Sequence, residues 1–194
     1  MKIKNFTILT ILTIALFTGC GDKEKIDDNI IAEQKKEIQT VPTFNLKTTS
    51  GKDIKIIAGK EGWKFKGYEN KVILLNFFGT WCPPCKAEIP HLENIRAKVK
   101  DDFEILAIDI GPRSGGVNSP KHMADFIKKY NISYPIVTGK GTSELFGAVS
   151  ELNKNGSIPF MILFNKQGKY VQYYLGIKPE EMLFKDITST IEMQ

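Results

Sequence analysis

Two cysteines three positions apart are the residues of this sequence best suited to chemistry. Cys82 and Cys85 stand in the segment Trp81-Cys-Pro-Pro-Cys85, after the apolar run 71–78 and before a helical pattern. On a helix this spacing places both thiols on one side, so they can close a small disulfide. A thiol at a helix N-terminus is favoured as the thiolate, which is the attacking form in disulfide exchange. The pattern predicts thiol–disulfide exchange with Cys82 as an exposed nucleophile and Cys85 as the resolving thiol beneath it.

Two alternatives explain such a pair without redox chemistry. A zinc site needs further ligands, and the chain's two histidines, His91 and His122, stand at spacings unlike those of zinc sites. A purely structural disulfide would close a very short loop, which removes little chain entropy and therefore stabilises poorly. Both alternatives remain open from the residues alone, although redox chemistry explains the spacing better and we expect no metal.

The pair must be positioned by the strand before it and the helix after it. Residues 71–78 are almost wholly apolar, which is typical of a strand buried on both faces of a sheet. Beyond the pair, apolar residues recur every three or four positions to about Lys100 and predict an amphipathic helix. Pro83 and Pro84 suit its first turn, where backbone N–H groups have no partner within the helix.

The rest of the chain predicts an α/β fold. Strands are expected at 103–110 and 134–137, in an early hairpin around 44–46 and 54–56, and in a late hairpin at 160–164 and 170–175. Helices are expected at 119–130, with Ser119 as N-cap, at 142–152, and from Pro179 to about Ile191. Because strands first alternate with helices and a hairpin comes late, we expect a central mixed sheet with helices on both faces.

The composition is that of a globular protein. Of the 194 residues, 42% are hydrophobic and 25% charged, which excludes a disordered or collagen-like chain, and three cysteines are too few for a disulfide-dense scaffold. The formal net charge of +5 falls further if Lys2 and Lys4 are removed with a leader segment. Nothing in this balance demands a polyanion, so we expect no nucleic-acid partner.

The first nineteen residues have the layout of a secretory signal peptide. Lys2 and Lys4 precede the charge-free run 6–17, which is shorter than the roughly 20 residues that a membrane-spanning helix needs. Thr18 and Gly19 are followed at once by Cys20, and this resembles the lipobox of bacterial lipoproteins, in which the cysteine is acylated. We expect lipidation at Cys20. The alternative is an ordinary signal peptide with a chance cysteine near its end.

Residues 20–41 are expected to form a lipidated tether. From Gly21 to Val41 charged residues dominate and aliphatic residues are scattered, so the stretch buries too little apolar surface to offset the entropy of ordering it. The predicted organisation is therefore a signal peptide at 1–19, the tether at 20–41 and a folded domain at 42–194.

The segment Asn76-Phe-Phe-Gly-Thr-Trp-Cys-Pro-Pro-Cys-Lys-Ala-Glu-Ile-Pro90, with Gly156-Ser-Ile-Pro-Phe160 and the turn Asn165-Lys-Gln-Gly-Lys169 further along, resembles the TlpA/ResA-like branch of the thioredoxin superfamily. The resemblance covers essentially 42–194. It implies a thioredoxin fold with an added N-terminal β-hairpin and an inserted helix, and a redox-active Cys82–Cys85 pair. It also implies a cis peptide bond between Ile158 and Pro159, where an extended substrate segment would pair with the backbone. From the residues alone, Pro159 could instead be a trans proline at a strand edge.

The resemblance also assigns roles near the pair. Thioredoxin carries a buried aspartate where this chain has Asn76, which cannot take a proton. Glu88 matches the acidic residue that this branch carries beside its active site; if buried, its pKa would rise and it could relay the proton of Cys85. The alternative is a solvated glutamate early in a helix. Trp81 is expected to shield the disulfide and to line the substrate surface.

The sequence thus predicts a lipid-anchored, extracytoplasmic thiol–disulfide oxidoreductase, on the periplasmic side, that needs no bound cofactor. The resemblance favours a reductant that acts on protein thiols or disulfides, including those of apocytochrome c during cytochrome c maturation, and that receives electrons from a membrane donor of the DsbD/CcdA type. Alternatives are a periplasmic disulfide-forming oxidase, a Cu(I) metallochaperone with Cys82 and Cys85 as soft ligands, and a non-catalytic binding module.

Overall fold

A computed structural model describes residues 41–193 of the chain. The expected signal peptide (1–19), Cys20 and nearly all of the expected tether (20–41) lie outside the described residues. Within residues 41–193, no helix is both long and apolar enough to cross a membrane.

One mixed sheet of eight strands runs through the described residues, in the order β3-β2-β1-β6-β5-β4-β7-β8. The strands are β1 (Thr43–Thr48), β2 (Asp53–Gly59), β3 (Gly62–Lys66), β4 (Val72–Phe78), β5 (Phe103–Asp109), β6 (Ile136–Thr138), β7 (Phe160–Phe164) and β8 (Tyr170–Leu175). The helices are α2 (Pro83–Val99), α3 (Pro120–Tyr130), α4 (Gly141–Ala148), the 3₁₀ helix η2 (Ser150–Leu152) and α5 (Glu180–Glu192).

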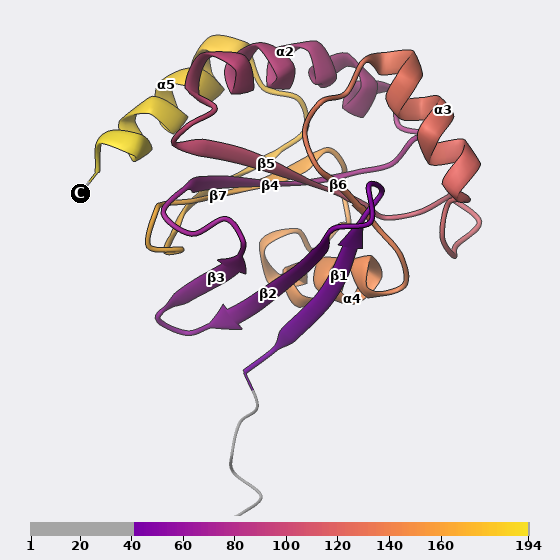
Figure 1. Ribbon diagram of the computed structural model, residues 1–194, viewed down its shortest axis with the longest axis horizontal. Helices are drawn as coiled ribbons and strands as arrows, with labels where there is room; N and C mark the ends of the chain where they lie inside the picture. The colour runs from indigo at the N-terminus through magenta and orange to yellow at the C-terminus, as the bar shows by residue number, and fades with distance from the viewer. Residues whose placement is uncertain (1–40, 194) are drawn as a thin grey trace, which may run out of the picture. The chain divides into compact units, whose positions relative to one another are not determined.

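The helices cover both faces of the sheet, as predicted. In Figure 1, α2, α3 and α5 lie above the sheet and α4 lies below it. Strand β4 is apolar except for Asn76, because Val72 and Leu74 pack into the core under α2, whereas Ile73, Leu75 and Phe77 pack into the core on the α4 side. All seven β4 residues are buried, so the strand that leads to Cys82 is fixed on both faces.

Strands β4 and β5 are parallel neighbours, paired from Val72–Phe103 to Phe78–Asp109. Their carboxyl ends therefore meet at one edge of the sheet, where the cysteine segment follows β4 and the loop 110–119 follows β5. On the other side of β4, β7 runs antiparallel, with Phe77 opposite Phe160. That pairing brings the segment before Phe160, which contains Pro159, to the same edge.

Most predicted elements are confirmed, with two differences. The early hairpin has a third strand, β3, which was not predicted; Trp63 and Phe65 of β3 pack against Phe164 of β7, with ring centroids 5.1 Å apart in both pairs. The helix expected at 142–152 ends at Ala148 and is followed by η2. By contrast, Ser119 caps α3 as predicted, and its hydroxyl accepts a hydrogen bond from the backbone N–H of His122 at 3.2 Å.

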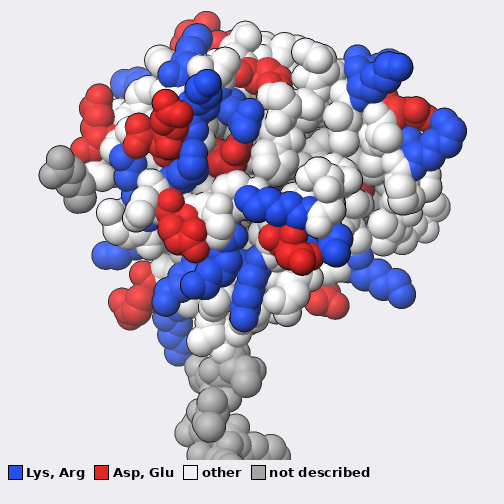
Figure 2. Space-filling view, viewed as in Figure 1, with Lys and Arg blue, Asp and Glu red and all other residues white. Residues whose placement is uncertain are grey.

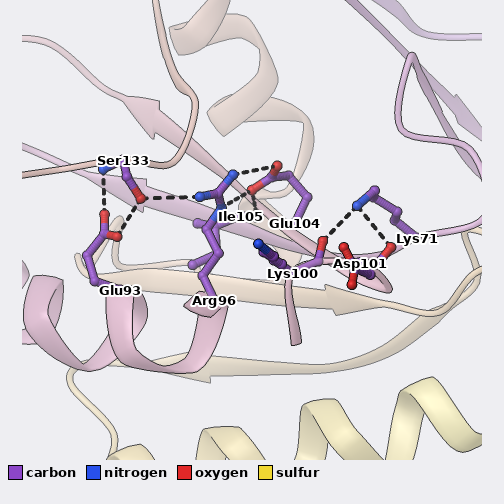
Figure 3. A network of polar contacts seen from close by, with 8 residues as sticks. All are labelled: Lys71, Glu93, Arg96, Lys100, Asp101, Glu104, Ile105 and Ser133. Carbon is purple, nitrogen blue, oxygen red and sulfur yellow. Dashed lines mark hydrogen bonds and ion pairs between the residues drawn. The ribbon is translucent and has the colours of Figure 1, made fainter. Parts of the chain in front are cut away.

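A polar network ties α2 to β5 and to the segment before β6 (Figure 3). Arg96 of α2 donates from Nε and Nη2 to the two carboxylate oxygens of Glu104, at 2.6 and 3.1 Å. It also donates to the hydroxyl of Ser133, which in turn donates to Glu93. The network fixes the C-terminal half of α2 and thereby the direction of the helix that carries the cysteines.

The charges of the face shown in Figure 2 are mixed. Lysine and arginine side chains are interspersed with aspartate and glutamate over the strands and helices in view. At ordinary ionic strength salt screens exposed charges beyond about 10 Å, and within that distance neighbouring charges of opposite sign offset one another. This face therefore presents no extended field of a single sign to a partner.

Candidate active site

The two cysteines form a disulfide at the start of α2. Helix α2 begins at Pro83, and Cys82 is its N-cap residue, with Sγ accepting a hydrogen bond from the backbone N–H of Cys85 at 3.2 Å. The Cα atoms of Cys82 and Cys85 are 5.3 Å apart, within the usual range for a disulfide. Pro83 and Pro84 occupy the first helical positions, as predicted. The pair therefore sits where unpaired N–H groups and the helix dipole favour a thiolate.

The expectation that Cys82 is exposed is wrong for this disulfide-bonded state. The exposed fraction is 3% for Cys82 and 2% for Cys85. Both belong to the core under α2, and Trp81 and Ile158 pack against that core. Burial therefore does not distinguish the two sulfurs, which differ in their positions on the helix and in their neighbours.

A backbone carbonyl from the other side of the site approaches Cys82. Its Sγ lies 3.8 Å from the carbonyl oxygen of Ile158, and the Ile158–Pro159 peptide bond is cis, as the resemblance implies. Gly79 makes the approach of the neighbouring side chains possible. A Cβ at that position would lie 2.9 Å from the Trp81 indole and 3.2 Å from Cδ1 of Ile158. The indole and Ile158 thus meet over Gly79, beside the reacting sulfurs.

Glu88 is buried below the disulfide, so the solvated alternative is wrong. Its exposed fraction is 1%, and its one hydrogen bond comes from Nδ2 of Asn76, which donates to Oε1 at 3.0 Å. Burial raises the pKa of Glu88 to about 8, although the hydrogen bond from Asn76 acts in the opposite direction. Glu88 is therefore mainly protonated at neutral pH, and a minority is in the ionised form, which can accept a proton.

The environment of Glu88 fits a neutral acid. Oε2 of Glu88 and Oδ1 of Asn76 are both buried without a hydrogen-bond partner among the described residues. Ionised Glu88 would present only acceptors, whereas protonated Glu88 also has an O–H donor. Since Cys85 and Glu88 are three residues apart on α2, they lie on the same side of the helix. The structure thus places a buried group that can donate or accept a proton on the same side of α2 as Cys85.

The loop 110–119 forms a further wall of the site that sequence reasoning missed. The Trp81 indole N–H donates to the carbonyl oxygen of Gly111 at 2.9 Å, and the guanidinium of Arg113 lies 4.4 Å from the centre of the Trp81 ring. At the other end of this wall, His122 contacts the hydroxyl of Thr80 at 2.9 Å.

Asp109, the last residue of β5, anchors this loop from below. Its carboxylate accepts hydrogen bonds from the Gly111 N–H and, on both oxygens, from the Asn118 side-chain amide, at 3.0–3.1 Å. The order of the predicted strands could have revealed the loop. It follows β5, the parallel neighbour of β4, and residues after the carboxyl ends of adjacent parallel strands lie at the same edge of the sheet.

The comparisons with known proteins agree with this geometry. Residues 36–191 match the family described as Redoxin. The chain belongs to the redoxin family. The thiol-disulfide oxidoreductase ResA of Bacillus cereus (strain ZK / E33L) is 27% identical over 182 residues, which are 93% of this chain and 94% of ResA. With its disulfide-bonded Cys82–Cys85 pair, this redoxin is a thiol–disulfide oxidoreductase.

Solved structures share the thioredoxin-like fold of this redoxin. A thiol:disulfide interchange protein of Chlorobium tepidum TLS superposes with a TM-score of 0.61 at 21% identity, covering 78% of this chain and 95% of that protein. The exposed lipoprotein thioredoxin Etrx1 of Streptococcus pneumoniae strain TIGR4 superposes with a TM-score of 0.55 at 20% identity, covering 76% and 99%. The predicted fold class is confirmed.

The structure brings the expected site residues of this redoxin together. Both cysteines and Glu88 are buried in the first half of α2, where Asn76 of β4 binds Glu88. The Ile158 carbonyl, which precedes Pro159, faces Cys82, and Trp81 and Ile158 pack against the core that contains both cysteines. Among residues 41–193, no group of three or more His, Cys, Asp or Glu side chains is arranged to hold a metal ion.

Proposed function

We propose that Cys82 is the nucleophile and Cys85 the resolving thiol of a protein disulfide reductase. The observation that carries this is the position of Cys82: it caps α2, and its sulfur faces the Ile158 carbonyl. The Cys82 thiolate attacks one sulfur of a partner disulfide, and the other partner sulfur leaves as a thiolate. Cys85 then attacks Sγ of Cys82, the mixed disulfide breaks, and the partner leaves reduced while Cys82–Cys85 becomes oxidised.

We propose that Glu88 accepts and returns the proton of Cys85. Resolution requires Cys85 as a thiolate, and a buried thiol with no nearby base ionises poorly. Glu88 has a pKa near 8 in the oxidised protein, close to that of a thiol, so a proton can pass in either direction at small cost. Asn76 holds the carboxyl group in place without itself exchanging a proton.

The substrate surface in this proposal consists of Trp81, Ile158 and Pro159. An extended polypeptide segment that pairs with the backbone before Pro159 would bring its cysteine over Cys82, since the Ile158 carbonyl lies next to Sγ. The Trp81 indole fills the space beside Ile158 and excludes water from the sulfurs.

For the cellular setting, we propose a lipid anchor at Cys20 and an extracytoplasmic domain. The basic, apolar and small-residue layout of residues 1–20 supports this, with signal peptide 1–19, tether 20–41 and domain 42–194. The pneumococcal protein Etrx1, an exposed lipoprotein thioredoxin, offers a precedent on the same fold. The resemblance to the ResA-like branch supports a reductant, with apocytochrome c as a substrate and a DsbD/CcdA-type membrane protein as electron donor.

Trapping of mixed disulfides in cells tests this function. A Cys85→Ala variant should accumulate mixed disulfides through Cys82, since the resolving step is lost, whereas the matched Cys82→Ala variant should capture few or none. Attached proteins are identified by mass spectrometry after diagonal gels. Capture of apocytochrome c or of a membrane electron donor supports the reductant, and capture of newly oxidised secreted proteins alone would show a disulfide-forming oxidase instead.

The redox potential gives an independent test of direction. For a reductant, the potential of the Cys82–Cys85 pair should lie nearer to about −270 mV than to about −120 mV, as measured by equilibration with glutathione or dithiothreitol. A pair that does not equilibrate with dithiothreitol at all would contradict exchange chemistry and favour a non-catalytic binding module.

A further inference from the structure

The loop 110–119 places one exposed cation at the mouth of the site. The Arg113 side chain is exposed, and its guanidinium lies 4.4 Å from the centre of the Trp81 ring. No carboxylate among residues 41–193 forms an ion pair with it. Its charge is therefore available to a partner that approaches the disulfide.

The loop that carries Arg113 is anchored near both of its ends. Gly111, two residues earlier, is held by the Trp81 indole N–H on its carbonyl oxygen and by Asp109 on its N–H. On the far side of the loop, Asn118 donates to both oxygens of the same aspartate. A guanidinium that stacks on an indole from an anchored loop loses less side-chain entropy on binding an anion than a free lysine would.

A bound polypeptide must pass close to this cation. The Trp81 ring on which Arg113 stacks lies over Gly79, next to Ile158, and the Ile158 carbonyl faces Cys82. A segment that runs along Ile158 towards Cys82 therefore places its residues beside Trp81. The groups flanking its reacting cysteine then come within a few residues' reach of the guanidinium.

The start of α2 adds further positive potential to that of the Arg113 guanidinium. The first turn of α2 contains no acidic residue, and the helix dipole directs its positive end at the same point. Lys86, half-buried, follows Cys85. Glu88 is buried and protonated at neutral pH, so it does not offset these charges.

We propose that Arg113 selects partner segments that carry aspartate or glutamate beside the reacting disulfide. This inference rests on the proposed function, in which Cys82 attacks a polypeptide disulfide. Charges at the rim of an interface act mainly on the association rate, so the selection appears in the second-order rate constant and weakens as salt is added.

Peptide disulfides that differ only in their flanking charge test the proposal. Three symmetric disulfides of a short peptide carry glutamate, glutamine or lysine on both sides of the cysteine. The full chain, with Cys20→Ser so that only Cys82 and Cys85 react, is reduced beforehand, and the rate of peptide reduction is followed by chromatography at low and high salt. The ratio of the rate constants for the glutamate and lysine peptides is compared among variants, because the ratio cancels any change in the thiolate fraction of Cys82.

In the otherwise unaltered chain, the glutamate peptide should react faster than the lysine peptide. In Arg113→Ala this ratio should fall by about three- to tenfold at low salt, and in Arg113→Glu it should invert. Arg113→Lys should keep most of the preference. The matched control is Lys129→Ala, which also removes a cation that lies over an aromatic ring, that of Tyr130, and it should leave the ratio unchanged.

The outcomes separate this inference from the proposed function. Equal ratios in the unaltered chain and in Arg113→Ala, with all three peptides reduced, would overturn the role of Arg113 and leave disulfide exchange intact. Failure to reduce any of the three peptides would overturn both. A ratio that falls equally in Lys129→Ala would assign the preference to net charge and also overturn the proposal.

Discussion

Two buried glutamates, one near each end of α2, have contrasting surroundings. Glu104 of β5 is 8% exposed, and both of its carboxylate oxygens are bound by Arg96 (Figure 3). Oε1 also accepts the backbone N–H of Ile105 at 3.0 Å. Glu88 of α2 is 1% exposed, receives one hydrogen bond from a neutral amide, and has one oxygen without a partner among the described residues.

The difference separates a structural acid from one suited to chemistry. A buried carboxylate that is fully paired stays charged and holds two elements together, and removing its partner is costly. A buried carboxyl group that faces no cation takes up a proton instead, so its charge state responds to pH and to changes nearby. The second arrangement lies one helical turn from Cys85 on α2, and the first lies at the other end of that helix.

The largest expected effect is on the free energy of unfolding, and it comes from removing the cation that pairs with Glu104. Arg96→Met leaves Glu104 buried without its cation, so the free energy of unfolding should fall by about 3 kcal/mol in urea denaturation. The folded fraction should still reduce peptide disulfides, because Arg96 does not contact the cysteines.

The control for this variant lies on the same helix. Lys98→Met removes a pair with Glu180 at 3.1 Å on the surface, and it should cost less than about 1 kcal/mol. Equal losses for Arg96→Met and Lys98→Met would show that Glu104 does not depend on its pairing.

The next effect is the pH dependence that Glu88 imposes on stability. Its pKa is raised from 4.5 to about 8 in the folded, oxidised protein. Between these values the unfolded chain loses the proton while the folded chain keeps it, so ionisation favours the unfolded state. The contribution of protonated Glu88 to the free energy of unfolding is therefore fully present below pH 4.5 and is lost as the pH rises to about 8. Over this range the free energy of unfolding falls by at most about 1.4 kcal/mol per pH unit.

Glu88→Gln should remove this slope. The free energy of unfolding of the oxidised protein, measured in urea at several pH values, should decline less steeply from pH 4.5 to 8 in the variant than in the unaltered chain. Subtracting the two curves cancels groups common to both, including Asp109, whose pKa burial also raises. Parallel curves would mean that Glu88 is already ionised at neutral pH.

The contrast between the two acids also marks what the sequence could predict. Glu88 was singled out because it matches the acidic residue that the resembling branch carries three residues after its second cysteine, but whether it is buried stayed open until the structure placed it. The pairing of Arg96 with Glu104 was not predicted, because it joins a helix to the next strand across a turn and no local pattern specifies such a contact.

The same limit applies to the fold and the site. Strand β4, helix α2 and the Ser119 cap of α3 were predicted because apolar periodicity and capping chemistry act within a few residues. Strand β3 was missed, since it is short and its aromatic residues pack against β7, about a hundred residues away in the chain. Arg113 was missed for a related reason: only the parallel pairing of β4 with β5 brings its loop to Trp81.

The smallest expected effect concerns the single hydrogen bond of Glu88. That bond from Asn76 lowers the pKa of Glu88 against the larger, opposite effect of burial. Asn76→Ala should therefore raise the pKa of Glu88 further, by about one unit or less, because the charged form loses its one donor. The shift can be followed from the side-chain carboxyl carbon in NMR spectra of the oxidised protein labelled at glutamate.

The direction of this shift decides what Asn76 does. A rise in the pKa of Glu88 that is smaller than the rise caused by burial would show that the amide makes a minor adjustment to an acid whose protonation depends mainly on its apolar surroundings. A fall would show that water enters the space left by the amide, in which case Asn76 acts mainly by keeping the site dry. Because Asn76→Ser leaves a smaller space and retains a hydroxyl donor, it should shift the pKa less than Asn76→Ala if the hydrogen bond is what matters.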